Sequence, residues 1–225
     1  MSGASAPSTQ VRDSIASLEV EQMQGLSVSD SVVNISIGGK HGPRSISDAV
    51  TEFRHRIRDL HRNGGKEAAR QLDETIAELC QSADDQLAAG LPSSAAAFIA
   101  LQALGHLRRG RADKMASCIA ESLALDPHCE QAHLIAGEFA HQQSQRMAEG
   151  EARNDALKTA ISHHQDVWKN GREGGAKNNA GYHLCIEFIE VKRLEEARSI
   201  KQDLLQSMTN PSGRKRVEAI SIPSQ

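Results

Sequence analysis

The stretch EQAHLIAGEFAH, residues 130–141, shows most clearly how this chain folds. Small residues recur along it at the spacing of one helical side, namely Ala132, Ala136, Gly137 and Ala140. Small side chains on a helix allow a neighbouring helix to approach closely. The same twelve residues also contain His133, His141 and Glu138, so they raise the question of a metal site or an acid–base site.

The spacing of these polar residues argues against a metal site on this helix. Zinc-binding helices carry two histidines at positions i and i+4 with a carboxylate between them. His133 and His141 are instead eight residues apart. At about 100° per residue, Glu138 lies about 140° around the helix from His133. The segment therefore predicts a close-packed helix, with Glu138 and His141 available to contact a partner.

A second pair of neighbouring histidines has the same difficulty. His163 and His164 are adjacent and precede Asp166 by a few residues. Adjacent side chains on a helix point about 100° apart, so both cannot easily bind one ion. We expect one surface histidine and one packed against Val167 and Trp168. The sequence therefore predicts no metal site, no cofactor and no catalytic residues.

Composition favours an all-α protein. Of the 225 residues, 39% are hydrophobic but only 3% are aromatic, and alanine and leucine provide most of the apolar side chains. Such a core suits closely packed helices better than a β-sandwich. The net charge of −3 gives no general attraction to nucleic acid or to an anionic membrane. We therefore expect neither nucleic acid nor a membrane among the partners.

Further features indicate a soluble, cytoplasmic protein. The N-terminal residues lack the basic-then-apolar layout of a signal peptide, and no apolar run reaches the roughly 18 residues that span a bilayer. The four cysteines form no C-x-x-C pair, which favours a reducing compartment. They are Cys80, Cys118, Cys129 and Cys185.

The chain divides into four segments. Residues 1–45 are rich in serine and glycine and are predicted to be largely disordered, although alternating apolar residues allow a short strand over 32–37, which could pair with a similar triplet at 220–222. Residues 46–91 form an N-terminal helical hairpin, 92–211 a repeat domain and 212–225 a solvated tail. The predicted helices lie between Ser45 and Asn63 and over 66–89, 93–109, 112–125, 130–147, 152–169, 177–191 and 194–208.

The basic run FRHRIRDLHR at 53–62 is a candidate for binding nucleic acid or an acidic partner. The next predicted helix carries several acidic residues. An antiparallel hairpin would set these two flanks against each other, and we favour this solvated pairing over a binding patch.

The helical hairpins resemble the tetratricopeptide-repeat family, whose unit is about 34 residues long. Units are recognised at about 96–129, from Glu130 onward, and at about 178–211. The small residues of 130–141 match the first helix of such a unit, and LALDP at 123–127 matches its usual end. The second repeat holds about seven extra residues, and the third repeat has Lys192 where the turn glycine is expected.

This resemblance implies an array of about three antiparallel hairpins after the N-terminal hairpin, with a concave groove formed by the first helices. Carried over position by position, the predicted groove residues are Ala97, Ala100, Leu104, Leu107, Gln131, Leu134, Glu138, His141, Asn179, Tyr182, Ile186 and Ile189. The lysine and asparagine clamp that some members use for a terminal carboxylate is missing at these positions.

The function implied by the resemblance is that of a non-enzymatic protein-binding module, an adaptor or chaperone. Its groove would hold an apolar or amphipathic partner segment. The alternative is an assembly or scaffold protein that forms homo-oligomers through the groove and the N-terminal segment. A metal-binding or enzymatic protein is the less favoured alternative.

Overall fold

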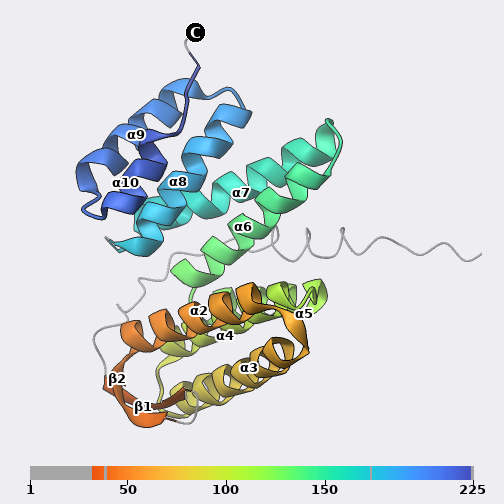
Figure 1. Ribbon diagram of the computed structural model, residues 1–225, viewed down its shortest axis with the longest axis vertical. Coiled ribbons are helices and arrows are strands. Elements are labelled where there is room, and N and C mark those ends of the chain that lie inside the picture. Colours follow the sequence, from red (N-terminus) through yellow and green to blue (C-terminus); the bar gives the residue numbers. More distant parts are fainter. Residues whose placement is uncertain (1–31, 38–39, 173, 224–225) are drawn as a thin grey trace, which may run out of the picture. The chain divides into compact units, whose positions relative to one another are not determined.

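The computed structural model describes residues 32–37, 40–172 and 174–223, with side chains from Ser45 onward. Two compact units are distinguished, residues 1–132 and 133–225. The described elements are β1 (Val32–Ile37), β2 (Lys40–Ser45), α2 (Ile46–Asn63), α3 (Gly65–Ala88), α4 (Pro92–Arg108), α5 (Ala112–Leu125), α6 (Glu130–Arg146), α7 (Glu151–Asn170), α8 (Gly175–Glu190), α9 (Leu194–Ser207) and α10 (Pro211–Glu218) (Figure 1).

The prediction of an all-α protein is confirmed for the described part of the chain. Helices α2 to α9 coincide with the eight predicted helices to within about two residues at most ends. Successive helices pack side by side within each unit, as α3 does with α4 and α8 does with α9. The finer expectation, a tetratricopeptide-like solenoid, stays a prediction.

In the first unit, β1 and β2 form an antiparallel pair in which Val32 lies opposite Ser45 and Ile37 opposite Lys40. The strand predicted over 32–37 is thus present, but its partner is 40–45 and not the triplet at 220–222. Ser45 then caps α2, because its hydroxyl accepts the Asp48 amide at 3.1 Å. Predictions for residues 1–31 lie outside the described residues.

Helices α2 to α5 enclose the core of the first unit. Phe53 of α2 meets Phe98 of α4 edge to face, with ring centroids 6.1 Å apart. One basic–acidic pair of the predicted kind joins α2 and α3, since Arg56 pairs with Glu78. In the first half of α3, Asp73 pairs with Arg109 and Arg111 of the α4–α5 turn. The other fully buried large side chains are Ile46, Ile57, Leu79, Leu101, Met115 and Ile119.

The second unit contains most of α6 and all of α7 to α10. Its apolar core is a cluster shared by α7, α8, α9 and α10, with the members Ile161, Leu184, Cys185, Phe188, Ala197, Ile200, Leu204 and Val217. No helix in the described part of the chain is long and apolar enough to cross a membrane.

The prediction of a solvated C-terminal tail is wrong for residues 211–218. Residues 211–218 form α10, which packs against α9. Asn210 caps this helix by accepting the Ser212 amide at 3.0 Å, and Pro211 occupies its first turn. Val217 is only 1% exposed because it joins the apolar core. Arg214 adds a hydrogen bond to the Leu205 carbonyl at 2.9 Å, so polar and apolar contacts together dock the segment.

Candidate functional site

A cluster of five histidines, four of them buried, lies in the second unit on three neighbouring helices. Helix α6 contributes His133 and His141, α7 contributes His163 and His164, and α8 contributes His183. Side-chain contacts link all five to carboxylates or to one another. Because polar groups are rarely buried without a partner, such a concentration in a helical core calls for a chemical explanation.

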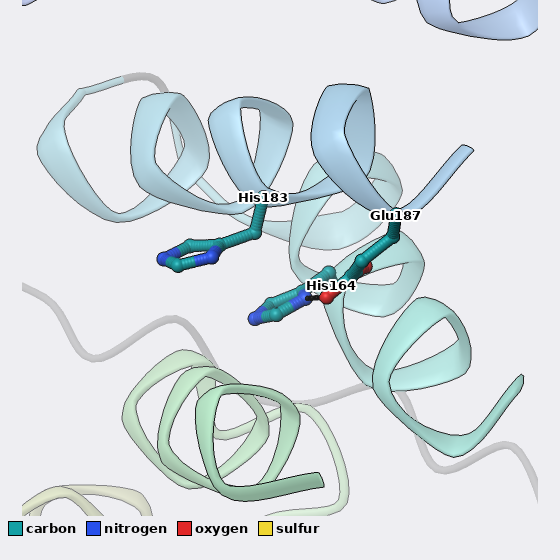
Figure 2. A group of neighbouring side chains, drawn as sticks. All are labelled: His164, His183 and Glu187. Carbon is teal, nitrogen blue, oxygen red and sulfur yellow. Dashed lines mark hydrogen bonds and ion pairs between the residues drawn. The ribbon is translucent and has the colours of Figure 1, made fainter. Parts of the chain in front are cut away.

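Glu187 is the centre of this cluster. Its side chain is fully buried, and the His164 Nδ1 atom lies 2.8 Å from its Oε1 atom. The His141 Nδ1 atom lies 3.3 Å from the same oxygen. The ring of His183 stacks on the ring of His164, with centroids 4.9 Å apart and planes inclined by 13°. Figure 2 shows the two rings one above the other, with Glu187 at the end of His164. We call His164, His183 and Glu187 the buried triad.

The charges around Glu187 are set by its neighbours. Burial acts to raise the pKa of Glu187, but hydrogen bonds from His141 and His164 outweigh it and lower the pKa below the usual glutamate value. The hydrogen bond to Glu187 raises the pKa of His141. Burial lowers the pKa of His183 to about 4. Glu187 therefore favours its carboxylate form, the raised pKa of His141 favours its protonated form, and a pKa of about 4 keeps His183 neutral near pH 7.

Two atoms of the buried triad have no hydrogen-bond partner. These are Nε2 of His164 and Oε2 of Glu187, both in fully buried side chains. His164 fits because Gly137 of α6 faces it, and a Cβ atom at Gly137 would lie only 2.5 Å from Nε2. The glycine in the quoted stretch therefore makes room for an imidazole.

A second histidine pair lies beside the triad. The Nδ1 atoms of His133 and His163 are 2.9 Å apart, and His133 Nε2 lies 3.3 Å from Asp166 Oδ2. Burial, together with repulsion from His133 and His164, lowers the pKa of His163 to about 3. The expectation of one surface histidine at 163–164 is wrong, because both side chains are buried and α6 covers the pair.

The predicted groove residues divide by burial. Ala100, Leu104, Leu134 and His141 are buried, so they are not available to a partner in this structure. For the two residues in α4 the reason is that α2, α3 and α5 all pack against this helix. The partly exposed ones are Ala97, Leu107, Gln131, Glu138, Asn179, Tyr182, Ile186 and Ile189.

Some predicted groove residues are brought together. The Asn179 amide donates to Glu138 Oε1 at 3.1 Å, which joins α8 to α6. Tyr182, Ile186 and Ile189 line one open cavity of about 320 Å³. In the first unit, Gln131 instead accepts a hydrogen bond from Arg54.

One feature of the sequence alone indicates part of the triad. His183 and Glu187 are four residues apart on α8, the spacing that places two side chains on one helical face. His164 comes from another helix, so only the fold brings it near them. Comparison with family models, with curated proteins and with solved structures finds no match to this chain.

Proposed function

We propose that the chain is a non-enzymatic protein-binding module that holds an extended apolar segment of a partner in the cavity beside α8. The observation that carries this proposal is the cavity of about 320 Å³ lined by Tyr182, Ile186 and Ile189. The repeat pattern assigns the same three residues to its groove positions. Glu190 and Arg216 add one charge of each sign to the lining.

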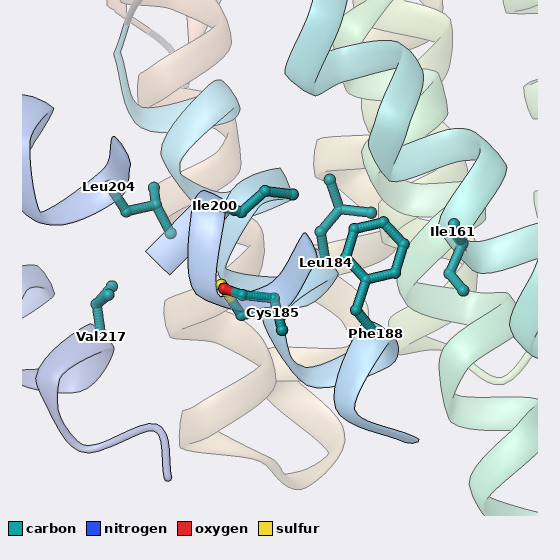
Figure 3. Close-up of a cluster of buried hydrophobic side chains, with 8 residues drawn as sticks. Ile161, Leu184, Cys185, Phe188, Ile200, Leu204 and Val217 are labelled. Atoms are coloured by element: carbon teal, nitrogen blue, oxygen red, sulfur yellow. The ribbon is translucent and has the colours of Figure 1, made fainter. Parts of the chain in front are cut away.

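The chain's own C-terminal segment indicates what fits this surface. Ile220 and Ile222 are partly buried against the apolar core of the second unit, and Ile220 also lines the cavity. They are two residues apart, the spacing at which an extended chain directs side chains to one side. Figure 3 shows Val217, just before them, on the side of α10 that faces Leu204.

Backbone groups of this segment are also bound. Lys201 Nζ donates to the carbonyl oxygens of Glu218 at 3.2 Å and Ile220 at 2.7 Å. The Arg216 guanidinium lies 4.5 Å from the centre of the Tyr182 ring. The surface thus combines apolar contacts with donors for main-chain carbonyls, the two elements of extended-peptide recognition.

A peptide-binding experiment tests the proposal. Fluorescein-labelled peptides with isoleucines at alternating positions are titrated with the full chain, and anisotropy is measured. We expect saturable binding that Ile186→Asp weakens by about tenfold or more, since a desolvated charge would face the apolar ligand. Leu87→Asp is the matched control, because Leu87 is 40% exposed and lies in the first unit.

The proposal fails if no alternating peptide binds, or if Leu87→Asp weakens binding as much as Ile186→Asp does. Circular dichroism of both variants verifies that the fold is retained. Light scattering at several concentrations tests the alternative function: if the chain forms oligomers that Ile186→Asp dissociates, the cavity is a contact between copies.

A further inference from the structure

We infer that His164, His183 and Glu187 together bind one divalent transition-metal ion, with Zn²⁺ as the first candidate. The three residues lie on α7 and α8, none of them lines the peptide cavity, and their metal binding does not depend on the peptide-binding proposal.

The donor types suit such an ion. Two imidazole nitrogens and one carboxylate form a ligand set that Zn²⁺ uses when it keeps a further position for water or a ligand, and that Fe²⁺ also accepts. One donor atom from each of the three residues lies within 4.8 Å of the other two. Bonds of about 2.1 Å in a tetrahedral arrangement place donors about 3.4 Å apart. The widest separation among the three donor atoms therefore needs to close by up to about 1.4 Å.

The residue that must move is the one with room to do so. His164 and Glu187 are fully buried, and their direct contact of 2.8 Å is already short enough. The His183 side chain is 22% exposed. Its ring lies nearly parallel to that of His164, so the nitrogen lone pairs of the two rings lie in parallel planes and do not yet converge on one point. Tilting the His183 ring about its own side-chain bonds would direct one nitrogen toward Glu187.

Helix geometry supports the convergence. His183 and Glu187 are four residues apart, so their side chains leave α8 on one face. α7 packs against α8 and presents His164 to that face. Figure 2 shows His183 and Glu187 leaving α8 on the same side, where His164 lies. Two ligands from one helix and one from its neighbour give a site that also fixes the pair of helices together.

An unsatisfied carboxylate oxygen provides an independent observation. Glu187 Oε2 makes no hydrogen bond although the Glu187 side chain is fully buried. Unpaired buried polar groups are costly and are commonly explained by a bound ion or water. A buried carboxylate in particular is expected to be paired or to bind a metal.

Surrounding residues would hold the ligands in place. His141 Nδ1 lies 3.3 Å from Glu187 Oε1, and Glu138 Oε1 lies 4.0 Å from His183 Nε2. Such outer contacts orient metal ligands and increase their basicity. Arg153 adds positive charge nearby, but it pairs with Glu190 at 3.2 Å.

The experiment uses the full chain stripped of metal and titrated with Co²⁺, whose visible absorption reports nitrogen and oxygen ligation, followed by competition with Zn²⁺. We expect one equivalent to bind and His183→Ala to weaken binding by about tenfold or more. His55→Ala is the matched control, because His55 is an exposed histidine on α2 and should change nothing.

X-ray absorption of the zinc-loaded wild-type chain provides a measurement that needs no variant. The expected spectrum has two imidazoles and an oxygen donor at about 2.0–2.2 Å. The inference is overturned if the wild-type chain shows no saturable binding near pH 7.5. It is equally overturned if His183→Ala keeps the wild-type affinity and fold, since surface histidines would then be the ligands. In either case the triad is a hydrogen-bonded structural network without a metal ion.

Discussion

Replacing Gly137 by alanine should destabilise the second unit, although alanine is the better helix former. The added Cβ would lie 2.5 Å from His164 Nε2 and 2.8 Å from two of its ring carbons. The ring has little freedom to retreat, because its Nδ1 atom is bonded to Glu187 at 2.8 Å and His183 stacks against its face. Either the imidazole or helix α6 must shift.

Two opposing terms set the magnitude. Adding a methyl group to a packed site costs about 1–3 kcal/mol. Exchanging glycine for alanine within a helix gains about 0.8–1 kcal/mol. The clash outweighs the helix preference over most of this range, so Gly137→Ala should lower the free energy of unfolding by about 1 kcal/mol. For a unit of this size the melting temperature should fall by about 4–8 °C.

Trp168 is the natural reporter, since it is the one tryptophan of the chain and lies in α7 beside the buried triad. Urea unfolding followed by its fluorescence measures the second unit separately from the first. The matched control is Gly175→Ala at the start of α8, where a Cβ would meet no atom within 4 Å. This control should leave stability unchanged or raise it slightly.

A double-mutant cycle identifies the source of the loss. His164→Asn removes the end of the ring that reaches α6 and keeps a donor for Glu187. In that background Gly137→Ala should become stabilising by up to about 1 kcal/mol, because only the helix preference remains. The coupling energy should therefore be about 1–3 kcal/mol. If Gly137→Ala costs the same in both backgrounds, the contact with His164 is not what requires glycine.

Two further predictions concern protonation and one buried hydroxyl. Burial lowers the pKa of His163 to about 3 and that of His183 to about 4. Between pH 6.5 and pH 4 the unfolded chain therefore binds protons at these two histidines that the folded chain does not bind. The second unit should lose stability as the pH falls through this range. His141, whose pKa is raised, opposes this trend only in part, so the urea midpoint at pH 5 should lie below that at pH 7, and an equal or higher midpoint would contradict the argument. Ser122 donates to a buried backbone carbonyl at 2.8 Å, so Ser122→Ala should cost about 1 kcal/mol in thermal unfolding of the first unit, whereas alanine at the exposed Ser117 should cost nothing measurable.

The helices were predictable because residues that end helices stand at most of their boundaries in the sequence. Gly110, with a φ of 70°, adopts a backbone conformation that favours glycine, and it ends the α4 region as expected. Helix α10 was missed for the opposite reason. Its only apolar anchor is Val217, and a single apolar residue shows no periodicity. Docking of α10 depends on the tertiary contact with α9, which sequence patterns do not contain.

The groove residues of the first unit show a different limit. The repeat register places Leu104 on an open face, yet the neighbouring Gly105 lies against Ile76 of α3, and α2 also packs on α4. The N-terminal hairpin thus covers a helix that the repeat pattern treats as exposed. A periodic motif predicts which residues share a face, but it does not predict which other segment will cover that face.

The buried polar network of the second unit calls for a reason other than stability of the fold. Replacing a buried ionic network by apolar side chains is often neutral or stabilising, so stability of the fold alone is a weak reason for burying Glu187 among histidines. The first unit also buries polar side chains, but Thr75 and Ser122 bond to backbone carbonyls and not to a buried carboxylate. Gly137 gives up helix preference to admit His164, and Glu187 Oε2 is left without a hydrogen-bond partner. Each of these features costs stability, and the ion that we infer at the triad would offset part of that cost.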